Sequence, residues 1–283
     1  MSYLDRIATC RRWDPAAYRP LVIDGRTLGR VSHGVARRLA GFPEVFVVSH
    51  DSVALAPGLD DFVSRSRAVA EVLGEMKARG EVPLWRGEDY PVVERWGAEP
   101  AFKIERAAAA LLGTRSFGVH LNGLVRGTGG LSMWVAKRAA NKQTAPGKLD
   151  HLAAGGQPVG LGVRENLIKE AGEEAGIPAE LAARAIPTGA VSYRCERPEG
   201  LRDDVLFCYD LELPADFAPA NTDGEVESFS LWPIAEVLAR VRDTEDFKFN
   251  VALVVIDLAI RLGLIAPDDP DYQEIWQGLR LAE

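Results

Sequence analysis

Residues 155–177, GGQPVGLGVRENLIKEAGEEAGI, form the most informative stretch of the 283-residue sequence. The glycine-rich first part predicts a loop, and residues 164–175 predict a helix that follows the loop. Gly176 is the residue type that commonly ends a helix, and Pro178 prevents the helix from continuing. The sequence therefore predicts a glycine-rich loop that leads into one short helix with defined ends.

The predicted helix carries three acidic residues on one face. Glu170, Glu173 and Glu174 stand at positions i, i+3 and i+4, which brings their carboxylates together. Alone, the like-charged pair of Glu170 and Glu174 destabilises the helix slightly. A Mg²⁺ ion would reverse that effect, because it prefers carboxylate oxygens and keeps other positions for water and phosphate. The alternative is a solvated acidic face, the usual explanation for an acidic run without such a loop before it.

Together, the loop and the acidic helix resemble the signature of the Nudix hydrolase family. That signature has a leading glycine, a glutamate, and then Arg-Glu-apolar-x-Glu-Glu-x-Gly-apolar at fixed spacing. The positions that match it are Gly155, Lys169, Glu170, Ala171, Glu173, Glu174, Gly176 and Ile177. The resemblance implies a Nudix fold and a metal-dependent pyrophosphohydrolase, with Mg²⁺ or Mn²⁺ as the cofactor.

Two positions depart from the signature. The first glutamate of the family falls on Leu161, which cannot bind a metal, and Lys169 replaces the arginine that orients the catalytic glutamate. Lysine can pair with a carboxylate but lacks the two-pronged geometry of arginine, so Lys169 stays a catalytic candidate. Glu165 could take part of the role missing at Leu161, or it could be an ordinary acidic residue of the first helical turn.

The resemblance also implies roles for the acidic residues. Glu170 and Glu174 are implied to bind the metal, and Glu173 to bind it or to position the attacking water. Glu170 and Glu173 are thus both catalytic candidates, and the sequence leaves open which carboxylate is the base. A further metal ligand usually comes from a later strand or loop, for which Glu225 and Glu227 are equal candidates.

The resemblance extends beyond this segment to a subgroup related to the N-terminal Nudix half of fungal thiamine pyrophosphokinases. The stretches that carry it are residues 118–125, 131–156, 167–175, 223–229 and 247–265. Members of that subgroup are associated with hydrolysis of thiamine diphosphate, and preferentially of damaged forms such as oxothiamine diphosphate, to the monophosphate. The subgroup often lacks the first glutamate and uses lysine for the arginine, so both departures agree with it.

Several residues before the acidic helix are candidates for substrate binding. Gly155 and Gly156 belong to the glycine-rich loop, where backbone can approach a phosphate. Trp134 could stack on a heteroaromatic ring, or it could be an ordinary core or surface aromatic. Arg138 and Lys142 could contact the diphosphate, or they could lie in a solvated loop.

Two other functions remain open. The chain could be a Nudix hydrolase of another nucleoside- or isoprenoid-type diphosphate; residues 146–156 also resemble isopentenyl diphosphate isomerases, whose catalytic Cys and Glu positions we cannot locate here. It could instead be a catalytically silent Nudix-like module that binds a ligand, which Leu161 favours and the intact acidic set opposes.

The pattern of the sequence changes near residues 110–116. The earlier part predicts a small α+β unit, with a helix over residues 66–79 and strands over residues 21–24, 27–31 and 44–49. The later part predicts helices over residues 233–242 and 250–262, and strands over residues 117–125, 131–136, 189–194, 204–213 and 226–231. We therefore expect an α+β protein, an α/β/α sandwich with a mixed sheet, in which residues 1–112 form a smaller accessory domain and residues 113–283 the Nudix domain.

The composition disfavours several classes of protein. The 33 basic and 41 acidic residues give a net charge of −8, which disfavours binding to nucleic acid. The apolar run at residues 251–266 contains charged residues and is too short for a membrane span. The three cysteines are too few for a disulfide framework, and the first residues carry charges where a signal peptide is apolar. We expect a cytoplasmic protein whose partner is a small-molecule diphosphate, and the sequence leaves a homodimer open.

Overall fold

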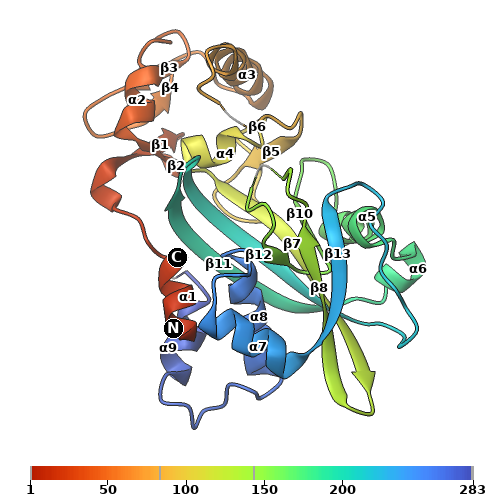
Figure 1. The fold of residues 1–283 in the computed structure, drawn as a ribbon. Coiled ribbons are helices and arrows are strands. Elements are labelled where there is room, and N and C mark those ends of the chain that lie inside the picture. Colours follow the sequence, from red (N-terminus) through yellow and green to blue (C-terminus); the bar gives the residue numbers. More distant parts are fainter. Residues whose placement is uncertain (1, 83, 143, 282–283) are drawn as a thin grey trace.

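The N-terminal part of the structure forms a small sheet, a hairpin and one long helix (Figure 1). The structure is a computed structural model that describes residues 2–82, 84–142 and 144–281. The sheet has the strand order β2-β1-β4-β3, and the hairpin pairs β5 with β6. In chain order the elements are η1, a 3-10 helix (Pro15–Ala17), β1 (Tyr18–Ile23), β2 (Arg26–Ser32), α2 (His33–Leu39), β3 (Phe46–Val48), β4 (Val53–Leu55), α3 (Phe62–Ala78), β5 (Asp89–Val92), β6 (Phe102–Glu105) and α4 (Ala108–Leu112).

The long helix α3 shows why this part folds as its sequence predicts. The Asp61 carboxylate caps the first turn by accepting the N–H groups of Val63 and Ser64, at 2.7 and 2.9 Å. Val69 and Leu73, on the predicted apolar face, are completely buried. The helix predicted over residues 66–79 is therefore confirmed, and it begins earlier than predicted because Asp61 caps it.

A seven-stranded mixed sheet forms the centre of the C-terminal part. Its main path runs β11-β12-β7-β8-β13, in which β7 and β12 are parallel and the other neighbours are antiparallel. The strands are β7 (Arg115–Gly127), β8 (Gly130–Arg138), β9 (Leu149–Asp150), β10 (Ala153–Gly156), β11 (Ile186–Arg197), β12 (Gly200–Glu212) and β13 (Val226–Pro233).

Strand β7 has two partners on one side. Its first half pairs with β10, so that Gly118 lies opposite Gly156, and its second half pairs with β8, so that Leu124 lies opposite Met133. Among the described residues, β10 pairs with β7 alone. The other edge of β10 is therefore open, and its backbone groups are available to side chains.

Helices cover both faces of this sheet, which confirms the predicted α+β class (Figure 1). On one face, Val119 and Leu121 of β7 meet Leu167 in a buried cluster. On the other face, Met133 of β8 belongs to a cluster that contains Val254. The helices of the first face are α5 (Val163–Ala175) and α6 (Ala179–Ala182), and those of the second face are α7 (Ile234–Asp243) and α8 (Val251–Arg261).

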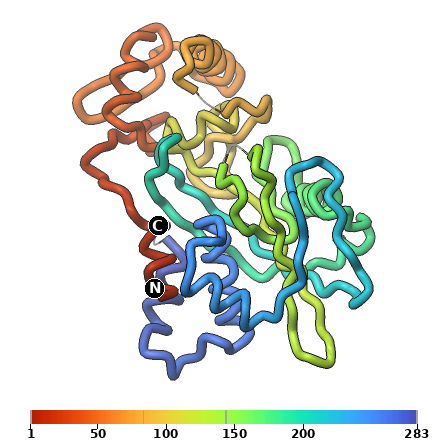
Figure 2. The backbone as a smooth tube through the Cα atoms, in the orientation of Figure 1, coloured from red at the N-terminus to blue at the C-terminus, as the bar shows by residue number. Residues whose placement is uncertain are grey.

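The first helix of the chain lies away from the N-terminal sheet. α1 (Tyr3–Thr9) contacts α7, α8 and α9 (Tyr272–Gly278), and Ile7 is buried in their cluster. Figure 2 shows the two chain ends close to each other. The division between residues 112 and 113 stays a prediction, and α1 lies on the C-terminal side of it in space.

The apolar run at residues 251–266 begins as α8. Every residue from 251 to 259 is buried, which accounts for the apolar composition of the run. No helix in the described part of the chain is long and apolar enough to cross a membrane. Cys10, Cys195 and Cys208 are free thiols, all of them buried.

Candidate functional site

The loop and helix of residues 155–177 fold as predicted. α5 begins after Gly162, whose N–H donates to the Glu165 carboxylate at 3.4 Å. It ends at Gly176, which has a φ of +65°, a left-handed conformation that favours glycine. Glu165 thus stabilises the first turn of the helix, which is the ordinary one of the two roles considered for it.

Two glycines of β10 permit close contacts that a side chain would prevent. A Cβ atom at Gly155 would overlap the Glu170 side chain, and one at Gly156 would overlap the Tyr90 hydroxyl. The Gly156 carbonyl also accepts a hydrogen bond of 2.8 Å from Asn166, a fully buried residue of α5. β10 therefore contacts the acidic helix through Gly155 and the N-terminal part through Gly156.

Glu174 is held at the open edge of β10. The Ala154 N–H donates to its carboxylate at 2.8 Å, and the residue is only 9% exposed. Burial, together with the negative charges of Asp150, Glu170 and Glu225, raises the pKa of Glu174 to about 8. Several carboxylates therefore lie near one another along this edge.

Lys169 joins the other two glutamates of α5. Its Nζ atom lies 3.1 Å from Glu170 Oε1 and 2.7 Å from Glu173 Oε2. The Glu173 side chain is half exposed, whereas that of Glu170 is 14% exposed. Burial raises the pKa of Glu170, and the charge of Lys169 opposes this effect. Lys169 therefore orients two carboxylates through one contact to each.

The two later acidic residues lie apart. Glu225 forms an ion pair with Lys142 and is close enough to Glu174 to raise the pKa of that residue. Although burial opposes the effect, Lys142 lowers the pKa of Glu225 itself. Glu227 lies at an irregularity of β13 and pairs with Lys137 at 2.7 Å. Of the two residues, Glu225 is the one whose charge acts on Glu174.

The chemistry of these carboxylates fits a divalent cation. Glu170 and Glu174 have raised pKa values, so the surrounding protein does not neutralise their charges fully. Carboxylate oxygens are the ligands that Mg²⁺ and Mn²⁺ prefer. Glu170, Glu174 and Glu225 could therefore hold such an ion at the open edge of β10.

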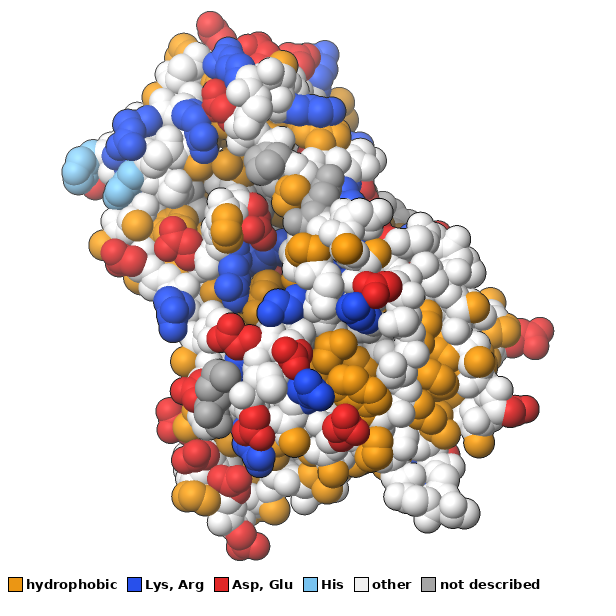
Figure 3. All heavy atoms as spheres, in the orientation of Figure 1, with side chains coloured by type: hydrophobic (Ala, Val, Ile, Leu, Met, Phe, Trp, Pro, Cys, Tyr) orange, Lys and Arg blue, Asp and Glu red, His pale blue; other side chains and the backbone are white. Residues whose placement is uncertain are grey.

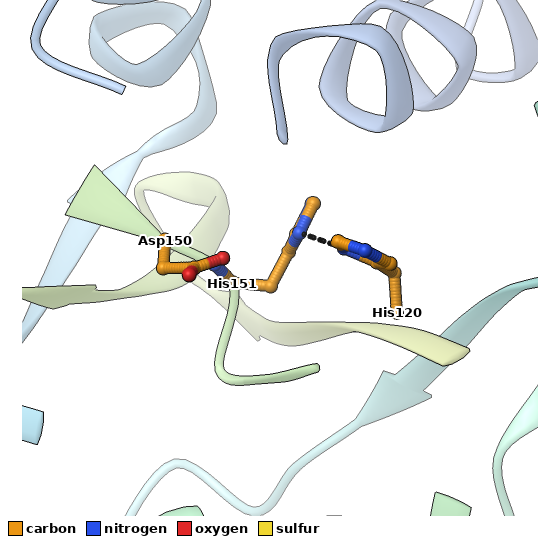
Figure 4. A group of neighbouring side chains, drawn as sticks. All are labelled: His120, Asp150 and His151. Carbon is orange, nitrogen blue, oxygen red and sulfur yellow. Dashed lines mark hydrogen bonds between the residues drawn. The ribbon is translucent and has the colours of Figure 1, made fainter. Parts of the chain in front are cut away.

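A second group of polar side chains, His120, Asp150 and His151, is buried nearby (Figure 4). Their ligand atoms lie within 4.8 Å of one another, and the two Nδ1 atoms are 2.8 Å apart, so that one donates to the other. Burial lowers the pKa of His120 and lowers that of His151 to about 4, so both rings are neutral at pH 7. The spacing of the histidines along the sequence did not indicate this group.

Asp150 already has two cationic partners. Its carboxylate lies 2.6 Å from Arg138 and 3.7 Å from Lys248. Although burial opposes the effect, these cations hold the pKa of Asp150 well below its usual range. A metal ion in this group would lie beside two fixed positive charges, so the group is better suited to a hydrogen-bonded polar core.

A cavity that is open to solvent lies where the N-terminal part meets β10. Figure 3 shows lysine and arginine side chains gathered where the upper and lower parts of the molecule meet. The polar and glycine residues that line the cavity include Arg86, Tyr90, Arg106, Gly118, His120, Gly155, Gly156, Arg202, Asp204, Lys248 and Asn250. The cavity therefore adjoins the acidic helix at the two glycines of β10.

The predicted substrate-binding residues have different positions. Gly155 and Gly156 line the cavity, whereas Trp134, Arg138 and Lys142 are not among its lining residues. Trp134 packs against the core cluster that contains α5. Arg138 binds the Asp150 carboxylate and the backbone carbonyls of residues 144 and 145. Lys142 pairs with Glu225.

Sequence reasoning missed the residues that reach this region from distant segments. Asp150 raises the pKa of Glu174, and Tyr90 and Arg106 line the cavity from the N-terminal part. No local pattern marks these residues. Asn166 is different, because a buried amide inside a helix next to the acidic face is a signal that could have been used.

Comparison with known proteins identifies relatives along almost the whole chain. Residues 2–116 match a family model described as a domain of unknown function (DUF4743). The chain is 44% identical over 282 residues to Nudix hydrolase 24, chloroplastic, and 40% identical over 290 residues to Nudix hydrolase 20, chloroplastic, both of Arabidopsis thaliana. Each match covers 98% of this chain and 77% of the relative. An uncharacterized protein of Saccharomyces cerevisiae is 34% identical over 83% of this chain and 73% of its own length.

Solved structures resemble the chain more weakly. A MutT protein from Methanosarcina mazei is 18% identical with a TM-score of 0.39, over 52% of this chain and 95% of that chain. A C. elegans Ap4A hydrolase is 12% identical with a TM-score of 0.40, over 53% of this chain and 99% of that chain. These scores are too low to support an assignment, which rests on the curated relatives.

The relatives correct one prediction and settle the family. A cytoplasmic location was predicted, and this prediction is contradicted because both Arabidopsis relatives are named chloroplastic. Identities of 40–44% over nearly the full chain agree with the intact acidic helix α5. The chain therefore belongs to the Nudix hydrolases, enzymes that act on diphosphates and generally use divalent metals.

Proposed function

We propose that this Nudix hydrolase cleaves thiamine diphosphate, or its oxidised form oxothiamine diphosphate, to the monophosphate and phosphate. The hydrolytic part is carried by the acidic helix α5, where Glu174 is buried against Ala154 of β10 and the negative charges of Glu170 and Glu225 act on it. The thiamine part is supported by the resemblance of residues 118–125, 131–156, 167–175, 223–229 and 247–265 to the subgroup related to thiamine pyrophosphokinases. The cavity agrees with it, because it contains arginines that suit a diphosphate.

The acidic residues divide into two roles. Glu170, Glu174 and Glu225 would hold Mg²⁺ or Mn²⁺, which would neutralise charge on the phosphates and lower the pKa of a water molecule. Glu173 is more exposed than Glu170 and Glu174 and would accept the proton of the attacking water. Lys169, which contacts both Glu170 and Glu173, would hold these two carboxylates in fixed positions relative to each other.

The reaction balances without a covalent intermediate. The water oxygen forms a bond to the terminal phosphorus while its proton passes to Glu173. The bond between that phosphorus and the bridging oxygen breaks, and the monophosphate leaves with the bridging oxygen. Glu225, which directly precedes β13, is preferred to Glu227 as the later ligand, because the charge of Glu225 acts on Glu174 whereas Glu227 pairs with Lys137.

A product assay tests the proposal. The full chain is incubated with Mg²⁺ and thiamine diphosphate, oxothiamine diphosphate, ADP or isopentenyl diphosphate, and the products are separated by chromatography. We expect monophosphate and phosphate from the thiamine compounds, with activity lost in excess EDTA and in Glu173→Gln. Glu180→Gln, an exposed acidic residue of α6, is the matched control and should retain activity. Faster turnover of ADP or isopentenyl diphosphate would refute the substrate, and full activity in EDTA would refute the mechanism.

A further inference from the structure

The cavity has a roof that comes from the N-terminal part of the chain. We define the roof as Arg86, Tyr90 and Arg106, which line the cavity opposite β10. The roof belongs to the region that matches the domain of unknown function, residues 2–116. Its residues are more than 45 positions away from the acidic helix in the sequence, so only the tertiary fold brings them to this site.

Direct contacts hold the roof against the glycine-rich loop that precedes α5. A side chain at Gly156 would overlap the Tyr90 hydroxyl, and its Cβ atom would lie 3.3 Å from Arg106 Cζ. The Val159 N–H, in the loop before α5, donates to the carbonyl of Asp89 at 2.9 Å. The roof and the loop therefore keep a defined separation.

A buried carboxylate holds the roof in shape. Glu105, which is 6% exposed, accepts the backbone N–H groups of Arg86 and Gly87 at 2.7 and 3.0 Å. Arg106 follows it directly and pairs through Nη1 with Glu88 at 2.9 Å. These bonds pre-organise the two arginines before any ligand binds, which lowers the entropic cost of binding.

The carboxylates beside Arg86 and Arg106 do not neutralise all of the positive charge of these two arginines. Among the described residues, Arg86 makes no salt bridge, and the salt bridge of Arg106 is the one to Glu88. Arg106 lies beside the acidic site, because a Cβ atom at Gly155 would overlap the Glu170 side chain and one at the adjacent Gly156 would lie 3.3 Å from Arg106 Cζ. Arginines beside a metal site do not bind the metal, but they attract the anion that the metal binds.

We infer that Arg86 and Arg106 bind the diphosphate group of the substrate from the side opposite the acidic helix, so that the domain of unknown function supplies half of the substrate site. The inference rests on the proposed function for the reaction that follows binding. The binding of a phosphate anion by the two arginines does not depend on which substrate is cleaved. The roof gives affinity and position for a phosphate, and the helix gives hydrolysis. Residues of the two parts of the chain thus act on the same group from opposite sides.

A binding measurement without turnover tests the roof. In the full chain carrying Glu173→Gln, calorimetry with Mg²⁺ and inorganic pyrophosphate gives Kd. We expect Arg106→Gln to raise Kd by about 10- to 100-fold, because a charge-assisted pair with the phosphate is lost. Arg86→Gln should raise it by about 3- to 10-fold, because Arg86 is exposed to solvent. Arg106→Lys should lie between the wild type and Arg106→Gln, because lysine keeps the charge and loses the fork.

The chain contains a matched control for Arg106. Lys103 lies three residues earlier, its side chain is 42% exposed like that of Arg106, and it pairs with Asp89 at 2.6 Å, yet it does not line the cavity. Lys103→Gln should leave Kd unchanged. Melting temperatures identify any variant that fails to fold, and Arg86→Gln, at an exposed position, tests the roof if Arg106→Gln does not fold.

The outcomes separate the two proposals. Equal Kd values for Arg106→Gln, Arg86→Gln and Lys103→Gln would contradict the inference that the roof binds the diphosphate. A folded wild type that does not bind pyrophosphate would contradict it as well. A chain that binds pyrophosphate through Arg106 but cleaves no thiamine compound would refute the proposed substrate and leave the roof standing. A chain that cleaves thiamine diphosphate equally well with and without Arg106 would refute the roof alone.

Discussion

Two groups of polar side chains that contain carboxylates lie close together in this protein and differ in one respect. At the open edge of β10, burial raises the pKa values of Glu170 and Glu174, although Lys169 lies 3.1 Å from Glu170. In the neighbouring core, Asp150 has Arg138 and Lys248 as partners, and its pKa is lowered. The same residue type is therefore suited to a metal in one place and to structure in the other, because burial outweighs the nearby positive charge only in the first group.

The largest effect is expected from removing the charge of Asp150, in the buried group that it forms with His120 and His151. Asp150→Asn should lower the free energy of unfolding by about 3–5 kcal/mol, because it leaves Arg138 and Lys248 buried without a counter-charge. Urea denaturation measures this. Asp246→Asn, which breaks an exposed pair with Arg240, is the control and should cost less than about 1 kcal/mol. A small effect of Asp150→Asn would mean that the two groups do not differ as described.

The opposite pattern is expected at the edge of β10. Glu174→Gln should reduce kcat/KM with Mg²⁺ by about 100- to 1,000-fold, because a carboxylate ligand is lost. The metal-free protein should be no less stable than the wild type at pH 8, since a neutral amide replaces a carboxylate that burial disfavours when charged. Steady-state kinetics and thermal melting measure the two quantities. Marked destabilisation of metal-free Glu174→Gln would mean that Glu174 has a structural role like that of Asp150.

The later glutamates give a smaller contrast. Glu225→Gln should reduce kcat/KM by about 10- to 100-fold, whereas Glu227→Gln should change it by less than about 2-fold. Both residues pair with a lysine, so each variant loses one ion pair, although Lys142, the partner of Glu225, is more buried than Lys137, the partner of Glu227. Equal losses of activity would contradict the separation of Glu225 from Glu227 seen in the structure.

The smallest effect is a pH dependence of stability. The pKa of Glu174 is about 8 in the folded chain and 4.5 ordinarily, so its contribution to stability is complete below pH 4.5 and is lost as the pH rises through 8. The neutral histidines add an opposite slope, but only below pH 6.5, the ordinary pKa of histidine. Between pH 6.5 and 8, the metal-free protein should therefore lose about 1–2 kcal/mol. Saturating Mg²⁺ or Glu174→Gln should flatten this slope, and a slope that persists in Glu174→Gln would assign it to other groups.

The acidic helix could be predicted because its causes are local. Gly176 ends α5 in the backbone conformation that favours glycine, and the i, i+3, i+4 spacing places the glutamates on one face. The mixed sheet and the helix α3 could also be predicted, since their apolar periodicity is a property of neighbouring residues.

The rest of the site depends on contacts between distant segments. Glu225 and Glu227 have the same local sequence context, and only the pairing of β13 with β8 separates them. Trp134 was considered for ring stacking, but the alternation of β8 turns it towards the core cluster of α5. Arg106 carries no sequence signal at all, because its partners Gly156 and Glu170 are 50 or more residues away.

The packing of α1 against α7, α8 and α9 has a consequence for the opening of the cavity. Since the chain starts and finishes on the same side of the large sheet, residues 11–114 form a nested insertion, tethered at both of its ends to one body. The hydrogen bond from the Val159 N–H to the Asp89 carbonyl adds a third connection between this insertion and the body, beside the acidic helix. Substrate and product are therefore expected to exchange through the solvent-open mouth of the cavity.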